Sequence, residues 1–328
     1  MAEMTLLQAI NHTLEQQMEK DDTIVVFGED AGFEGGVFRV TAGLQKKFGE
    51  ERVFDTPIAE AAILGSAVGM AANGLKPIPE IQFSGFMFPG YNQIATHMAR
   101  MRNRSRGKFG LPIVIRMPYG GGVRALEHHS EALETLFAHI PGLKLVIPST
   151  PYDAKGLLTA AIHDPDPVIF FETKRIYRAF KQEVPEEEYT VPIGKARITK
   201  KGNDITLVAW GAMMRESEKA IKQIEEAFDV TIELIDLRTI APMDSNTVVE
   251  SVKKTGRLMV VHEAVKTLGI GSELISRVNE EAFTYLEAPP VRVTGHDITV
   301  PLPKGEHLHM VDAKRIVYEL KKLIKYQI

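Results

Sequence analysis

A glutamate at the start of an almost uncharged segment is the first residue whose position suggests chemistry. Glu60 opens a stretch of apolar and small residues that reaches position 72. A carboxylate at the start of a helix can simply interact with the positive end of the helix dipole. In an apolar cleft, the loss of solvation would instead raise the pKa of the carboxyl group and let it share a proton with a ligand. The residues by themselves leave both interpretations open.

Two further acids follow an apolar, β-branched run at 23–28. Glu29 and Asp30 come directly after Gly28, where the predicted strand ends. Ligands of parallel α/β sheets bind beyond the carboxyl ends of the strands, so this position suits a binding residue. Solvated loop charges are an equally good interpretation. The glycine-rich segment that follows, 31–41, predicts tight turns or a loop shaped for function.

A third candidate is the loop at 118–134, which combines three glycines with two adjacent histidines. His128 and His129 fall between the end of a predicted strand and the start of a predicted helix. Histidine is the side chain best suited to proton transfer near neutral pH, although a single histidine is often structural or exposed. A zinc site is not expected, because adjacent histidines cannot easily face one metal and no third ligand lies at helical spacing.

A basic run also stands out, and it comprises Arg100, Arg102, Arg104, Arg106 and Lys108. Such a run indicates a solvated face or a subunit contact. Nucleic acid is not an expected partner, because 39 basic and 43 acidic residues give a net charge of −4. Motifs of the Gly-x-Gly-x-x-Gly, Walker, Gly-x-Ser-x-Gly and His-Glu-x-x-His types are absent from the sequence.

The composition is that of a folded protein that lacks thiol chemistry. Hydrophobic residues make up 44% of the 328 residues and charged residues 25%, and there is no cysteine. Disulfides, thiolate metal sites and a cysteine nucleophile are therefore excluded. Residues 1–20 do not resemble a signal peptide, and no apolar stretch reaches the ~18 residues of a membrane span. We expect no membrane contact and a cytoplasmic location.

The pattern of apolar residues predicts alternating strands and helices in the first part of the chain. Strands are predicted at 23–28, 77–83, 112–118, 143–148 and 167–171, and helices at 4–18, 58–74, 91–103, 131–140 and 153–163. This alternation predicts a mostly parallel sheet covered by helices on both faces. It therefore forms a first α/β domain over residues 1–180.

A polar segment and a second alternating series follow. Residues 181–203 are charged and proline-containing, and we expect them to be a linker because they can bury little apolar surface. Strands are then predicted at 205–210, 230–237, 258–264 and 290–295, and helices at 215–227, 244–254, 272–282 and from 312 onward. The fold class is therefore α/β with two doubly wound domains, the second over residues 204–328.

The candidate residues lie in stretches that resemble a known family. These stretches are FGEDAGFEGGVFRVT, RVFDTPIAEAAILGSAVG, PIPEIQFSGF, GGGVRALEHHSEALE and PGLKLVIPSTPYDAKGLL. They resemble the beta subunits of the thiamine-diphosphate-dependent first components of 2-oxoacid dehydrogenase complexes, and the likeness covers nearly the whole chain. It is closest to the pyruvate-specific members, with branched-chain and acetoin dehydrogenases as alternatives. The resemblance implies a transketolase-like pyrimidine-binding domain and a transketolase C-terminal-like domain.

The resemblance also implies a division of labour between two chains. An alpha subunit would hold magnesium and the cofactor diphosphate through a Gly-Asp-Gly motif, which this sequence lacks. The family forms alpha2-beta2 heterotetramers that decarboxylate a 2-oxoacid and transfer the acyl group to lipoyl-lysine. The second domain would build the dimer interface and dock the dihydrolipoyl acyltransferase core, whose lipoyl domain visits the site. A docking subunit without catalysis and a self-sufficient transketolase-like enzyme are the remaining alternatives.

Residue roles follow from the same resemblance. Glu60 matches the glutamate that hydrogen-bonds a ring nitrogen of the aminopyrimidine, and Glu29 matches an acid on a proton path beside it. Phe86 and Ile58 match residues that pack on the pyrimidine. His129 matches the histidine that positions the intermediate and assists acyl transfer, whereas His128 is a poorer match.

A potassium ion is the last feature that the resemblance implies. Several relatives bind it through backbone carbonyls and one side chain. The matching positions here are Ile113, Ala161, Ile162, Asp164 and Asp166. An aspartate at 166 replaces the asparagine of the animal enzymes, so the match is incomplete at that position.

Overall fold

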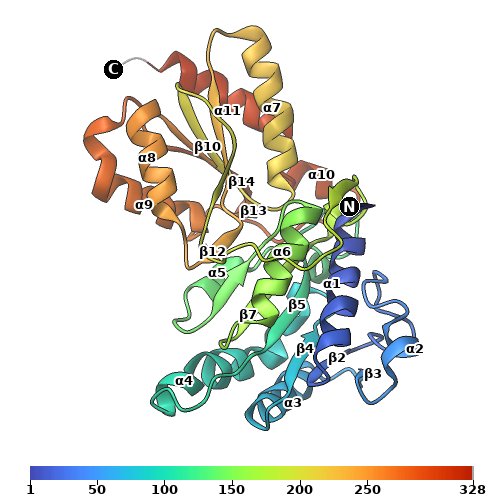
Figure 1. The fold of residues 1–328 in the computed structure, drawn as a ribbon. Coiled ribbons are helices and arrows are strands. Elements are labelled where there is room, and N and C mark those ends of the chain that lie inside the picture. The colour runs from blue at the N-terminus through green and yellow to red at the C-terminus, as the bar shows by residue number, and fades with distance from the viewer. Residues whose placement is uncertain (327–328) are drawn as a thin grey trace. The chain divides into compact units, whose positions relative to one another are not determined.

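The computed structural model describes residues 1–326 and separates into two compact units (Figure 1). The first unit comprises residues 1–123 and 128–193, and the second comprises residues 124–127 and the chain from Gly194 onward. Each unit has its own sheet covered by helices, as the alternating sequence pattern predicts.

The first unit is built on parallel strands in the order β6-β7-β5-β4-β2-β3. These are β2 (Ile24–Gly28), β3 (Val53–Asp55), β4 (Lys76–Glu80), β5 (Val114–Tyr119), β6 (Lys144–Val146) and β7 (Val168–Thr173). Every residue of β2, β5 and β7 is buried, as expected for strands covered on both faces. In the register of the sheet, Gly28 lies beside both Asp55 and Glu80, so acids gather at one edge.

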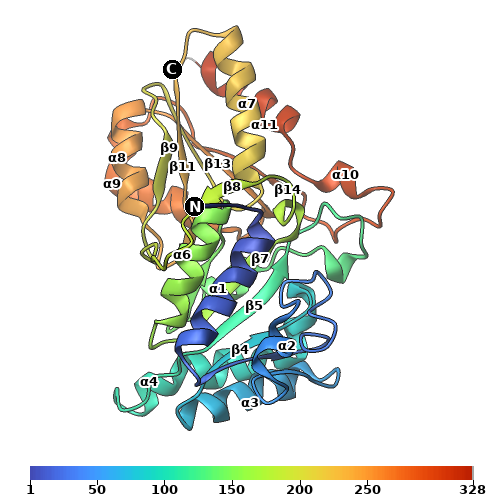
Figure 2. The same cartoon turned by 45° about the vertical axis from the view of Figure 1, so that its right-hand side comes forward.

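Three longer helices cover this sheet, and local sequence explains where two of them begin. They are α1 (Leu6–Lys20), α3 (Glu60–Ala72) and α6 (Pro151–Ile162), and α1 lies beside α6 (Figures 1 and 2). Thr5 and Gln8 form a capping box at the start of α1, and Thr150 caps α6. Helix α3 has no side-chain cap and begins at Glu60 itself.

The remaining elements of the first unit are short. The helices are α2 (Leu44–Phe48), α4 (Met101–Arg104) and α5 (Glu134–Ala138), with single turns η1 (Ser84–Gly90), η2 (Gln93–His97), η3 (Met98–Arg100), η4 (Glu127–His129) and η5 (Lys174–Ile176). The strands β1 (Ala2–Met4) and β8 (Gln182–Val184) form an antiparallel pair. None of the helices within residues 1–326 combines the length and the apolar character needed to cross a lipid bilayer.

The second unit has a sheet in the order β14-β13-β10-β11-β9, parallel except for β9. Its strands are β9 (Arg197–Lys200), β10 (Ile205–Ala209), β11 (Ile232–Asp236), β13 (Leu258–Val265) and β14 (Val291–Gly295), and the short strand β12 (Thr239–Ala241) does not belong to this sheet. Helices α7 (Met213–Ala227) and α11 (Ala313–Lys325) pack together, as do α8 (Ser245–Thr255) and α9 (Ile270–Ala282) (Figure 2). The turn η6 (Phe283–Tyr285) and helix α10 (Glu306–His309) complete the unit.

The predicted helix over 91–103 differs from the structure. A π-helical turn at Gln93–His97, a 3-10 turn at Met98–Arg100 and the short helix Met101–Arg104 replace one continuous helix. Ile94 and Met98 are buried here, as they would be on one face of a continuous α-helix. The spacing of apolar residues therefore does not reveal the extra residue of a π turn. The predicted helix over 131–140 is also shorter, and spans Glu134–Ala138.

The segment expected to be a linker carries structure at both ends. Residues 182–184 pair with β1, residues 197–200 pair with β11, and the two units divide between Ile193 and Gly194. Edge strands are held by backbone hydrogen bonds and keep polar side chains, so a polar composition does not distinguish them from a linker.

One buried ionic cluster lies inside the first sheet. Arg116 on β5 is fully buried and donates to Glu80 at 2.7 Å and to both carboxylate oxygens of Glu172 at 2.6 and 3.0 Å. The hydroxyl of Tyr177 donates to Glu172 at 2.6 Å. Burial raises the pKa of Glu80, although the charge of Arg116 opposes that shift. A single guanidinium therefore holds buried carboxyl groups from two strands, β4 and β7.

Replacing this guanidinium should destabilise the chain strongly. In Arg116→Met, two buried carboxyl groups lose their cation, so the free energy of unfolding should fall by about 3–5 kcal/mol. Arg102→Met is the matched control, because Arg102 is 43% exposed and its pair with Asp166 should contribute at most ~1 kcal/mol. Urea denaturation of both variants measures the difference, and equal losses would contradict the prediction.

Candidate active site

Two neighbouring carboxyl groups define the candidate site in the first unit. Glu29 follows the last residue of β2 and is 7% exposed, and Glu60 is the half-buried first residue of α3. Glycine is required at position 28, because a Cβ there would lie 2.5 Å from the carbonyl oxygen of Glu80. This close strand contact brings the chain directly to Glu29 at the carboxyl edge of the sheet.

The two acids interact through their charges. Burial is the largest cause that raises the pKa of Glu29, and the carboxylates of Glu60 and Asp30 raise it further. Asp30 is held by the side-chain amide of Gln82 at 2.8 Å. Glu29 therefore keeps its proton to a higher pH than an ordinary glutamate, which is the behaviour expected of a group that exchanges protons at a site.

The turn η1 connects Glu60 to the histidine loop. At Gly90, a Cβ would lie 2.4 Å from Cδ1 of Leu64 and 2.8 Å from the carbonyl oxygen of Glu60. At Gly85, a Cβ would lie 2.2 Å from the carbonyl oxygen of His128. Glycines at both ends therefore let η1 contact the first turn of α3 and the histidine loop at the same time. Phe86 lies between these two contacts on the same turn.

His129 is enclosed by aromatic rings. Its ring centroid lies 4.5 Å from that of Phe83 and 4.9 Å from that of Phe86, both in edge-to-face geometry. The ammonium of Lys174 donates to the carbonyl oxygen of His129 and lies 5.1 Å from the ring centroid of Phe83. These contacts fix the orientation of the imidazole, as a group that positions a ligand requires.

His128 lies in a different environment. Its side chain is 59% exposed, and its Nδ1 lies 3.5 Å from a carboxylate oxygen of Glu131. The loop itself is closed by the amide of Gly120 and the hydroxyl of Ser84, which donate to the carbonyl oxygen of Glu131 at 3.0 and 2.9 Å. The two histidines thus differ in exposure: His128 is exposed, whereas His129 packs against the aromatic side chains.

Ile58 is 85% exposed, two residues before Glu60. An apolar side chain of this size next to a half-buried carboxyl group leaves an apolar surface beside the acid pair. This surface is available to a ligand or to another chain.

Family models match both units. The transketolase pyrimidine-binding domain matches residues 2–179, and the transketolase C-terminal domain matches residues 194–316. The chain is 68% identical over 325 residues to the pyruvate dehydrogenase E1 component subunit beta of Acholeplasma laidlawii, which covers 99% of each chain. This chain belongs to the E1 beta-subunit family.

Other members of the E1 beta-subunit family agree over the same length. The subunit of Mycoplasma pneumoniae is 56% identical and covers 97% of each chain, and that of Bacillus subtilis is 47% identical and covers 99% of this chain and 100% of the relative. Among solved structures, a split-gene transketolase described as an inactive beta4 tetramer aligns over 100% of both chains with a TM-score of 0.80. At 21% identity, that structure bears on the fold alone. The two transketolase-like α/β domains are thereby confirmed.

The residues around Glu60 fit the pyrimidine end of the cofactor of the E1 beta-subunit family. Within residues 1–326, the Glu60 side chain has no hydrogen-bond or ion-pair partner, so it is free to accept one from a ligand. Aromatic Phe86 and apolar Ile58 are available to contact a flat heterocycle. Residues 1–326 contain no cluster of three acids or histidines suited to a metal ion.

The predicted potassium positions are close together but already carry protein cations. Lys144 donates to both carboxylate oxygens of Asp164 at 2.7 and 2.6 Å, and Arg102 pairs with Asp166. The carbonyl oxygen of Ile113 accepts from Val168, and that of Ala161 accepts from the amide of Asp164; Ile162 is buried on α6. This arrangement gives no support to a further cation, and the potassium site stays a prediction.

Three site residues escaped the sequence analysis. Phe83 and Lys174 hold His129, and Gly85 permits the contact with the histidine loop. Lys174 lies 45 residues from His129, and no spacing rule connects them. The only signal in the sequence for these contacts was the pair Gly85-Phe86, which closely follows the aromatic Phe83.

The raised pKa of Glu29 predicts a pH-dependent cost to stability. Its folded pKa lies above the ordinary 4.5, so its favourable contribution is complete below that value and is lost as pH rises through the folded pKa. Glu29→Gln should therefore raise the melting temperature at pH 7 and have little effect at pH 4. Calorimetry at both values measures this, with exposed Glu50→Gln as the control. A lower melting temperature for Glu29→Gln at pH 7 would contradict the assignment.

Proposed function

We propose that this chain is the beta subunit of the decarboxylating component of a pyruvate dehydrogenase complex. The observation that carries the proposal is the buried Glu29, whose pKa is raised, beside Glu60, whose side chain has no hydrogen-bond or ion-pair partner within residues 1–326, at the carboxyl edge of the first sheet. Full-length relatives that bear the name pyruvate dehydrogenase E1 component subunit beta support it. The reaction is oxidative decarboxylation of pyruvate with transfer of the acetyl group to lipoyl-lysine.

Glu60 and Glu29 manage protons at the pyrimidine end of the site. Thiamine diphosphate, when bound, supplies the carbon nucleophile that attacks the keto carbon of the substrate. Glu60 shares a proton with a pyrimidine nitrogen, because its carboxylate lies at an apolar helix start without a competing partner. Glu29 holds a proton beside it to a higher pH than an ordinary glutamate does, because burial and the charge of Glu60 raise its pKa.

His129, Phe86 and Ile58 position the reacting groups. Phe86 and Ile58 contact the pyrimidine and exclude water from the Glu60 carboxyl group. The imidazole of His129, oriented by Phe83 and Phe86, hydrogen-bonds the substrate-derived group and assists its transfer to the lipoyl domain of the dihydrolipoyl acyltransferase.

A second chain completes the site in this proposal. The alpha subunit holds magnesium and the cofactor diphosphate, in keeping with the lack of a metal-ligand cluster in residues 1–326. Two alpha and two beta chains form the heterotetramer, whose beta C-terminal domain docks the acyltransferase core. A non-catalytic docking role is less favoured, because Glu60, Glu29 and His129 are all present and grouped with Phe86 in one unit.

Substitution of Glu60 or His129 should remove overall activity without preventing assembly. We expect Glu60→Gln and His129→Ala to lower acetyl transfer by about 10²–10⁴-fold, as for loss of a general acid or base. His128→Ala is the matched control, because the neighbouring side chain is exposed and should change the rate by less than about threefold. Reductive acetylation of the lipoyl domain measures the rate, and gel filtration checks assembly. Near-normal turnover in both site variants would contradict the catalytic roles proposed for Glu60 and His129.

Activity should also depend on the second chain and on the substrate. The purified chain alone should release no carbon dioxide from pyruvate, and adding the cognate alpha subunit with thiamine diphosphate and magnesium should restore release. Comparing pyruvate with branched 2-oxoacids in the assembled enzyme identifies the substrate. Full activity of the isolated chain would refute the divided site, and a preference for branched substrates would replace pyruvate by that class.

A further inference from the structure

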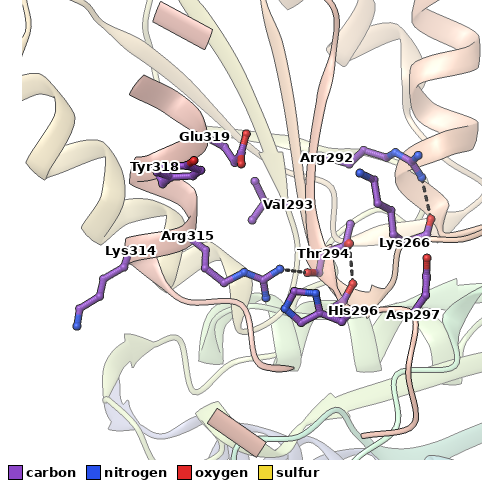
Figure 3. A pocket seen from close by; sticks show the side chains of 11 residues that line it. Lys266, Arg292, Val293, Thr294, His296, Asp297, Lys314, Arg315, Tyr318 and Glu319 are labelled. Atoms are coloured by element: carbon purple, nitrogen blue, oxygen red, sulfur yellow. Dashed lines mark hydrogen bonds between the residues drawn. The ribbon is translucent and has the colours of Figure 1, made fainter. Parts of the chain in front are cut away.

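A second cavity lies in the other unit, beyond the carboxyl ends of β13 and β14. Its volume is about 560 Å³, and it lies between these strand ends and the first turns of α11 (Figure 3). The same end of a parallel sheet carries the ligand sites of doubly wound folds. All of its lining residues belong to the second unit, and none of them is a residue assigned above to thiamine chemistry.

The lining of this cavity is positively charged within an acidic protein. The lining contains four cations, Lys266, Arg292, Lys314 and Arg315, and two acids, Asp297 and Glu319, which is an excess of two positive charges; the side chain of Lys314 extends away from the other three cations (Figure 3). The whole chain has a net charge of −4. A local excess of cations in a concave site attracts anions from solution, because the surrounding protein focuses the field.

The two acids are engaged by other groups. The carboxylate of Asp297 accepts from the amide and the hydroxyl of Thr267, both at 2.8 Å. That of Glu319 accepts from Lys322 at 3.0 Å. Within residues 1–326, none of the four lining cations is in an ion pair with a carboxylate. In this part of the chain, no direct ion pair therefore occupies these cations, although the hydrogen bonds from Thr267 and then the charge of Lys266 lower the pKa of Asp297, and the charge of Glu319 acts on Arg315.

Both guanidinium groups are held in place by backbone oxygens. Arg292 donates to the carbonyl oxygen of Lys266 at 2.8 Å and to the hydroxyl of Ser272. Arg315 donates to the carbonyl oxygens of Thr294 at 2.6 Å and of His309 at 3.0 Å. Neutral acceptors orient the guanidinium without cancelling its charge, so further N–H groups can bind an anion with little loss of side-chain entropy.

We propose that this cavity binds a small organic phosphate. A net charge of +2 matches a phosphoryl dianion, and arginine is the side chain best shaped to bind its oxygens in pairs. The volume exceeds that of a bare phosphate and lies within the range of small-molecule sites. Val293 and the ring of Tyr318 supply an apolar wall for the organic part of the ligand.

Calorimetric titration of the full chain tests this site independently of decarboxylation. The probes are phenyl phosphate and inorganic phosphate, in a phosphate-free buffer without thiamine diphosphate, because that cofactor is itself an organic phosphate and would compete. Phenyl phosphate should bind saturably and more tightly than inorganic phosphate, because only phenyl phosphate can contact Tyr318 and Val293. Added salt should weaken both interactions by screening.

Charge-neutralising variants locate the binding. Lys266→Gln/Lys314→Gln removes two exposed lining cations without touching a hydrogen bond that holds the fold, and should weaken phenyl phosphate binding about tenfold or more. Lys201→Gln/Lys321→Gln makes the same change in net charge outside the cavity and should stay within about twofold.

Three results would overturn the proposal. The first is the absence of saturable binding, and the second is equal weakening by both double variants. The third is phenyl phosphate affinity no better than that of inorganic phosphate, which would show that the cavity does not bind the organic part of the proposed ligand. If Lys266→Gln/Lys314→Gln kept its phosphate affinity but lost the acyltransferase core, the surface would bind an acidic polypeptide instead. Failure of any of these tests leaves the Glu60 assignment untouched, since the two sites share no residue.

Discussion

The charge of the half-buried Glu60 acts on the buried Glu29, and much of the first unit serves to hold the two carboxyl groups in this position. Burial and then the charge of Glu60 raise the pKa of Glu29, because neighbouring acids oppose each other's ionisation. Glu29 directly follows the strand β2, and Glu60 is the first residue of the uncapped helix α3. Glycine at position 28 allows the end of β2 to lie close to Glu80. The raised pKa of Glu29 means that ionisation of this carboxyl group costs stability.

The surrounding structure makes that cost tolerable. Arg116 hydrogen-bonds two buried glutamates inside the sheet, so the acid-rich edge rests on strands whose own carboxyl groups share one cation. The turn η1, which contacts α3 through Gly90 and the histidine loop through Gly85, joins the acid pair to His129. Phe83 then packs on the imidazole, and Lys174, from a distant segment, holds the main-chain carbonyl of His129. Rigid support of this kind is what a preorganised site requires.

Each unit carries a site at the same edge of its parallel sheet, but the two sites differ in charge. The first gathers carboxyl groups beside apolar side chains, which suits proton exchange with a flat heterocycle. The second gathers lysines and arginines in excess over acids, which suits an anion. One fold rule therefore places both sites, and the side chains that follow the strands decide what each of them binds.

The sequence by itself determined the α/β class, the two alternating series, the longer strands and helices, and the candidates Glu29, Glu60 and His129. Apolar periodicity and strand-end position depend only on local order, so they can be recovered without coordinates. The sequence did not reveal the π turn at Gln93–His97, because a continuous α-helix would bury the same apolar residues. It also did not reveal the paired strands at the edges of the expected linker, because edge strands and linkers are equally polar. Only the tertiary structure decided that Glu29 and Glu60 interact, that His129 rather than His128 is enclosed, and that the lining cations of the second unit meet around one cavity. Those facts depend on contacts between residues distant in sequence, and no local pattern encodes the distance between them.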